Sequence, residues 1–88
     1  MNLRKHNIQK ESNITRPNNI IWKTKNAEEI DLYDMSIMHI INCILLIKKN
    51  LYKHKYIKNI YTLEQLQWEY ALIQTFKDEL DWRKINEF

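Results

Sequence analysis

The longest apolar run of this 88-residue sequence, MSIMHIINCILLI at residues 35–47, constrains the fold more than any other feature. Thirteen residues are too few to cross a bilayer, which takes about 20 apolar residues, so we expect no membrane partner. Their spacing predicts a helix that is capped by Asp34 or Ser36 and ends near Leu51 or Lys53. Because this helix is apolar around most of its circumference, it needs cover on more than one side.

Two short segments before this helix predict a β-hairpin. Residues 20–24 and 29–33 alternate apolar and polar side chains and are rich in β-branched and aromatic residues. The turn between them contains Asn26, which adopts the left-handed conformation of a tight hairpin more readily than most residues. A lone hairpin is marginal in water, so we expect Trp22 and Ile30 to pack against a helix.

A second helix is predicted to run from the motif TLEQ at residues 62–65 to about Ile85, because TLEQ matches a capping box. We interpret the carboxylates around Glu79 as a solvated face near Arg83. The apolar side chains that we expect on the buried arc of this helix are Leu63, Leu66, Tyr70, Ile73, Phe76 and Leu80.

Together these elements predict an α+β fold that is mostly helical. Residues 1–19 have no apolar period and carry four basic residues against one acidic residue, which indicates a flexible basic arm. Residues 20–88 form a single domain of a β-hairpin and two antiparallel helices. A chain of this length is near the lower limit for one independent core, so we also expect a homo-oligomer that covers the first helix.

Part of the sequence resembles a known pattern. Small accessory proteins of tailed phages share the pattern W-x-T, a turn with Asp-Gly, I-x-I and then M-x-x-x-H-[L/I]-x-N-x-I. The resemblance covers residues 22–49, with NAEE in place of the turn glycine. It implies a phage origin, the host cytoplasm, and the binding of a host protein such as an enzyme or an antiviral defence component. The matching residues are Trp22, Thr24, Ile30, Leu32, Met35, His39, Ile40, Asn42, Ile44, Ile47 and Lys49.

The residues that come nearest to a catalytic or metal site are His39 and Cys43, one helical turn apart. Two ligands are too few for a structural zinc ion, and Cys43 lies within the apolar run, where a thiol is rarely reactive. We therefore predict no catalytic residue, no metal and no cofactor, and we expect that the chain is not an enzyme.

Two tryptophans on the second helix are the main candidates for binding a host protein. Trp68 and Trp82 are fourteen residues apart, roughly on one side of the helix and away from its apolar arc. Tryptophan is enriched at interface hot spots, whereas in the alternative interpretation the arm or the hairpin covers both rings. We add His39 and Asn42, on one face of the first helix, to this candidate site.

Residues 48–61 support an alternative function, because they hold five lysines and three tyrosines and no acidic residue. With the basic arm they could bind a nucleic acid or an anionic nucleotide by neutralising phosphates and stacking on bases. In the opposing interpretation, which we favour, they form a solvated turn in which Tyr52 and Ile57 pack inward and the acidic second helix balances the lysines. The candidate anion-binding residues are Lys48, Lys49, Lys53, Lys55, Lys58, Tyr52 and Tyr56.

Overall fold

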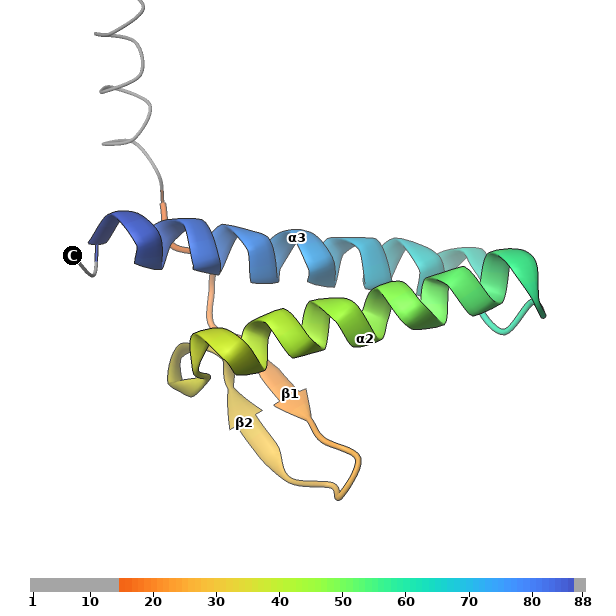
Figure 1. Ribbon diagram of the computed structural model, residues 1–88, viewed down its shortest axis with the longest axis horizontal. Helices are drawn as coiled ribbons and strands as arrows, with labels where there is room; N and C mark the ends of the chain where they lie inside the picture. Colours follow the sequence, from red (N-terminus) through yellow and green to blue (C-terminus); the bar gives the residue numbers. More distant parts are fainter. Residues whose placement is uncertain (1–14, 87–88) are drawn as a thin grey trace, which may run out of the picture.

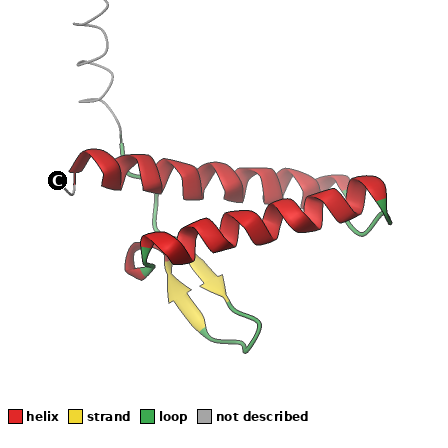
Figure 2. Cartoon of the chain, viewed as in Figure 1, coloured by secondary structure: helices red, strands yellow, loops and turns green. Residues whose placement is uncertain are grey.

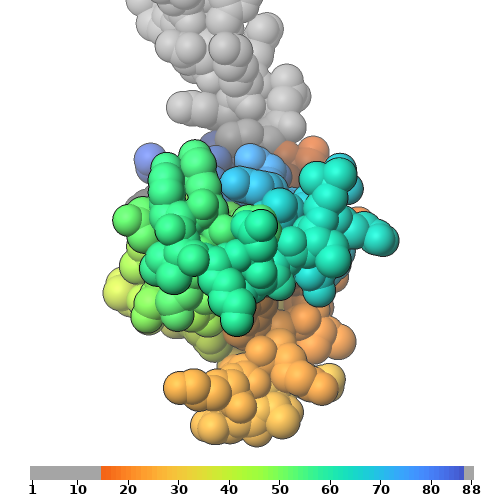
Figure 3. All heavy atoms as spheres, turned by 90° about the vertical axis from the view of Figure 1, so that its right-hand side faces the viewer, coloured from red at the N-terminus to blue at the C-terminus, as the bar shows by residue number. Residues whose placement is uncertain are grey.

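The computed structural model describes residues 15–86 and confirms a mostly helical α+β fold. Strands β1 (Ile21–Lys23) and β2 (Glu29–Asp31) form an antiparallel hairpin, and a short 3-10 helix, η1 (Leu32–Asp34), follows. Helices α2 (Ile37–Tyr56) and α3 (Leu63–Asn86) then run antiparallel to each other (Figure 1). The hairpin projects from one side of this helix pair (Figures 2 and 3). Residues 1–14 of the predicted arm lie outside the described residues.

The hairpin has the predicted pairing but a different turn. Trp22 pairs with Ile30, so these two side chains share the face that packs against the core. The left-handed residue of the turn is Ala27, with φ of 65°, and the expectation for Asn26 was wrong. The Ala27 N–H donates to the Thr24 carbonyl, and this closure of the turn places the positive φ at residue 27.

Helix α2 begins as predicted, with Ser36 as its cap: the Ser36 hydroxyl accepts a hydrogen bond from the His39 N–H at 3.1 Å. It ends at Tyr56, beyond the predicted end near residues 51–53. The chain turns away only where the N–H groups of Ile60 and Tyr61 donate to Nδ1 of His54, each at 3.0 Å. Residues 48–56 are therefore helical, and only residues 57–62 connect the two helices.

Helix α3 starts at the predicted capping box. The Gln65 side chain accepts from the Thr62 N–H at 2.8 Å, and the Thr62 hydroxyl accepts from the Gln65 N–H at 3.1 Å. The predicted buried arc is only partly correct, because Leu63 and Tyr70 are exposed. The buried line of α3 instead passes through Leu72, Phe76, Glu79 and Arg83, because the hairpin and the segment before it cover that side.

The core lies between the two helices and the base of the hairpin. Trp22 contacts Phe76 edge to face, with ring centroids 5.6 Å apart, which ties the hairpin to α3 as expected. Residues 15–19, which we call the strap, belonged to the predicted flexible arm but pack along the same unit through Arg16 and Asn19. The buried apolar side chains are Leu32, Met35, Ile40, Cys43, Ile44, Ile47, Leu72, Ile73 and Phe76.

Candidate functional site

The outward side of α2 carries a line of exposed apolar side chains that we call the α2 stripe: Met38, Leu45, Tyr52 and Tyr56. The exposed fractions of these residues are 62%, 57%, 60% and 62%, in that order. Met38, Leu45 and Tyr52 are each seven residues apart, and Tyr56 is one further turn along, so all four lie on one side of the helix. The opposite side of α2 is buried in the core. Helix α2 is therefore apolar on both sides, but a single chain covers only the side that faces the core.

Lysines line both edges of the α2 stripe. Lys48 and Lys55, seven residues apart, follow one edge, and Lys49 and Lys53, four residues apart, follow the other. All four are exposed, and Lys58 is exposed beyond the end of the helix. Helix α2 contains no acidic residue. Among residues 15–86, both ion pairs within 4 Å involve Glu79, so none of these lysines is paired with a carboxylate.

Three structural parts of the interpretation of residues 48–61 as a solvated turn were wrong, since residues 48–56 are helical. Tyr52 and Ile57 point outward instead of inward, and the acidic side chains of α3 do not pair with the lysines. The rings of Tyr52 and Tyr56 pack against each other with centroids 4.8 Å apart, and Lys55 Nζ lies 5.1 Å from the Tyr56 ring. The predicted anion-binding residues on α2 therefore lie together on one helical surface.

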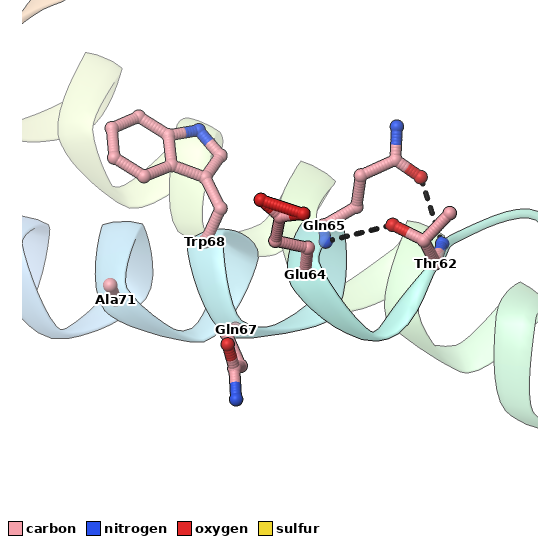
Figure 4. Close-up of a pocket in the computed structure, with 6 residues that line it drawn as sticks. All are labelled: Thr62, Glu64, Gln65, Gln67, Trp68 and Ala71. Carbon is pink, nitrogen blue, oxygen red and sulfur yellow. Dashed lines mark hydrogen bonds between the residues drawn. The ribbon is translucent and has the colours of Figure 1, made fainter.

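The structure separates the four residues that were predicted to bind a protein. Trp68 is exposed at the start of α3, where it lines a shallow pocket with Glu64, Gln67 and Ala71 (Figure 4). Trp82 is half-buried, because the Arg16 guanidinium covers its ring at 4.1 Å from the centroid. Within the described part of the chain, no ring contact joins the two tryptophans.

The two predicted residues of α2 also differ in accessibility. Asn42 is exposed and lies near the Lys49 edge of the α2 stripe, four residues after Met38. His39 is half-buried, and only its backbone N–H has a described role, in the Ser36 cap. Of the four predicted residues, Asn42 is therefore the one that adjoins the stripe.

A buried ionic cluster was missed in the sequence. Glu79 is fully buried and accepts hydrogen bonds from Arg83 Nε at 2.7 Å and from Arg16 at 2.7–3.2 Å. Burial raises the pKa of Glu79, but the hydrogen bonds and charges of the two arginines outweigh burial and leave this pKa below its ordinary value. Residue 79 was interpreted as solvated, which was wrong.

Arg83 connects this cluster to the chain before α2. Its Nη1 group donates to the Met35 carbonyl at 2.6 Å, and its Nη2 group donates to the Leu32 carbonyl at 3.0 Å. Leu32 begins the 3-10 helix η1 and Met35 caps its end, so Arg83 binds both ends of this short helix, and its bond to the Leu32 carbonyl adds to the one from the Met35 N–H. The sequence signal was the spacing of Leu72, Phe76, Glu79 and Arg83, which places both charged residues on the buried line of α3.

The described residues offer no arrangement for metal binding, because no group of three or more His, Cys, Asp or Glu side chains converges within residues 15–86. Cys43 is almost completely buried, and burial raises the pKa of its thiol. In the same part of the chain, no helix is both long and apolar enough to span a bilayer. Comparison with protein-family models, curated proteins and solved structures found no match.

Proposed function

We propose that this chain is a non-enzymatic binding module that binds a partner protein on the α2 stripe. One observation carries the proposal: four large apolar side chains, each more than half exposed, lie along one side of α2 with lysines on both edges. Contiguous exposed apolar surface that is bordered by polar residues is typical of protein–protein interfaces. Burial of this line by a partner would complete the cover that α2 lacks in the monomer.

The dimensions and charge of the stripe define the partner. From Met38 to Tyr56 the helix rises about 27 Å, the length of a helix of about five turns. The seven-residue spacing of Met38, Leu45 and Tyr52 suits a second helix whose side chains pack between them. Unpaired lysines on both edges favour a partner whose apolar surface is flanked by carboxylates.

A second candidate is an anionic nucleic acid, which the unpaired lysines and exposed tyrosines of α2 favour. Two features favour a protein instead. The first half of the stripe, with Met38 and Leu45, is aliphatic and uncharged, so phosphates and bases gain little there. Tyr52 and Tyr56 pack on each other, which leaves less ring surface for stacking on bases.

The resemblance of residues 22–49 to phage accessory proteins leads us to propose a host protein as the partner, inhibited by the binding. The homo-oligomer that the sequence led us to expect would place a second copy of the chain on the same stripe, so it competes with a host protein for this surface. The two occupants differ in a measurable way, because self-association at micromolar concentration doubles the molar mass of 10.9 kDa in light scattering, whereas a host protein leaves the purified chain monomeric.

The proposal is tested with two matched substitutions in the full chain. Leu45→Asp introduces a charge in the centre of the stripe, and Ile21→Asp makes the same type of change at an equally exposed position of the hairpin. Both side chains are largely solvent-exposed, so circular dichroism should show intact helices for both variants. The new carboxylate at position 21 faces Asp31 across the hairpin, so its cost falls on strand pairing. We expect the tagged chain to retain a nuclease-resistant host protein that Leu45→Asp loses and Ile21→Asp keeps.

Three results would contradict the proposal. If nuclease releases the bound material, the nucleic-acid candidate replaces it. If Leu45→Asp only converts a dimer into a monomer, the stripe serves self-association. If both variants bind as the unmodified chain does, the stripe is not the interface.

A further inference from the structure

Three residues that are distant from Arg16 in sequence surround its guanidinium. The Tyr33 ring lies 3.8 Å and the Trp82 ring 4.1 Å from the guanidinium carbon, so the two aromatic rings contact this group together. Glu79 accepts from Arg16 Nε at 2.9 Å and from Nη2 at 2.7 Å, which is a two-point contact with a carboxylate. We call Tyr33, Glu79 and Trp82 the arginine socket.

Besides Arg16, the socket contacts two other residues of the strap, Pro17 and Asn19. The Tyr33 hydroxyl donates to the Pro17 carbonyl at 2.7 Å, and the Tyr33 N–H donates to the Asn19 side-chain oxygen at 3.1 Å. The strap is therefore held at three successive points: a guanidinium, the carbonyl of the next residue and an amide oxygen two residues further on. The side-chain contacts select an arginine and an asparagine three residues later, and the strap supplies them in the sequence Arg-Pro-x-Asn.

The socket is held in place by groups other than Arg16. Arg83 fixes the Glu79 carboxylate, and Arg83 itself is anchored on the carbonyls of Met35 and Leu32. Glu79 is completely buried, and residues 32–34 are held by the same anchor. A site whose charged group is already oriented loses less entropy when it binds its ligand.

We propose that the arginine socket is a recognition site for the arginine of an Arg-Pro-x-Asn segment, and that the strap occupies it as a ligand in cis. A tethered ligand has an effective concentration of about millimolar or more, so the strap excludes weak ligands from other chains. When Arg16 is removed, the socket accepts a guanidinium in trans. Lysine is a poor substitute, because an ammonium group lacks the planar two-point geometry.

The first experiment uses full-length Arg16→Ala and ethylguanidinium, which replaces the atoms that this substitution removes. We expect tens of millimolar ethylguanidinium to raise the melting temperature of Arg16→Ala saturably, by several degrees. The unmodified chain should show no rise, and ethylammonium should have no effect on either protein. If Arg16→Ala is unfolded, helical circular dichroism should recover on addition of ethylguanidinium and not of ethylammonium.

The second experiment tests the motif. Arg16→Ala/Asn19→Ala removes two anchors of the strap, and the acetylated and amidated peptide TRPNN is then added in trans. At ten times its dissociation constant, the peptide should raise the melting temperature by roughly 6–11 °C. TKPNN and TRPNA should each bind at least tenfold more weakly. The effect should vanish when Glu79→Gln is added to the variant.

The proposal is overturned if neither ethylguanidinium nor the TRPNN peptide stabilises the vacated socket. It is also overturned if ethylammonium and TKPNN stabilise it equally well, because the site then binds positive charge without selecting a guanidinium. Stabilisation that persists after Glu79→Gln places the ligand elsewhere and has the same consequence.

Discussion

Glu79→Gln tests the energetic role of the buried ionic cluster. Glutamine has nearly the same size as glutamate, so the substitution removes the negative charge without leaving a cavity. Two arginines lose their carboxylate: Arg83, which is buried, and Arg16, whose side chain is 28% exposed. Among residues 15–86, the charge on Arg83 then has no counter-charge within hydrogen-bonding distance.

The expected loss follows from these contacts. Removal of one partner from a buried ion pair costs about 3–5 kcal/mol. Arg83 keeps its hydrogen bonds to the Leu32 and Met35 carbonyls, and Arg16 is partly solvated, so we expect the lower end of this range, about 3 kcal/mol. For a domain of this size, that loss lowers the melting temperature by roughly 12–24 °C.

The assay is urea unfolding followed by circular dichroism, with differential scanning calorimetry for the melting temperature. Asp81→Asn is the matched control, since Asp81 is an exposed carboxylate two residues along the same helix. Its expected effect on the free energy of unfolding is below about 0.5 kcal/mol. A Glu79→Gln loss below about 1 kcal/mol, or one equal to that of Asp81→Asn, would refute the assignment of Glu79 as the centre of the cluster.

Three further predictions concern pH, the thiol and the hairpin turn. Because the arginines hold the pKa of Glu79 below its usual value, its contribution is present above the ordinary carboxyl pKa of about 4.3 and is lost as the pH falls through the folded-state pKa. Glu79→Gln should therefore reduce the loss of stability between pH 5 and pH 2 in urea titrations, and an unchanged acid profile would contradict this. Burial that raises the pKa of the Cys43 thiol should make its alkylation at neutral pH at least about 100-fold slower than that of a free thiol, and equal rates would show that it is accessible. Ala27→Gly should raise the free energy of unfolding by up to about 1 kcal/mol, because glycine accepts a φ of 65° without a Cβ clash, whereas a decrease would mean that the turn is not left-handed at this residue.

The local signals in the sequence were sufficient for the starts of both helices and for the hairpin, but not for the end of α2 or for the 3-10 helix η1. The capping box at Thr62 and Gln65, the Ser36 cap and the alternation around Trp22 and Ile30 involve neighbours in sequence or one short turn. Such features depend on backbone preferences and on hydrogen bonds within a few residues, so they can be predicted without knowledge of the tertiary structure. The left-handed conformation of Ala27 was not predicted, because alanine adopts it less readily than asparagine. The hydrogen bond from the Ala27 N–H to the Thr24 carbonyl accompanies this conformation in the folded turn.

The buried cluster and the stripe were harder to predict, for different reasons. Glu79 pairs with Arg16 across 63 positions of sequence, and a carboxylate on a helix is usually solvated unless it is paired. The helical spacing that puts Glu79 on the same side of α3 as Leu72 and Phe76 was the sequence feature that could have indicated its burial. The apolar circumference of α2 was evident, but only the tertiary structure shows that the hairpin and α3 leave the Leu45 side uncovered.

The most direct test of the proposed function is site-specific photo-cross-linking in the full chain. A benzophenone amino acid replaces Leu45 in one sample and Ile21 in a matched control, and each is irradiated in nuclease-treated host lysate. We expect one host-protein adduct at position 45 that is absent at position 21, is competed by excess unmodified chain, and is lost with Lys49→Glu/Lys53→Glu. Equal adducts at both positions, or adducts only with the chain itself, would contradict the proposed function.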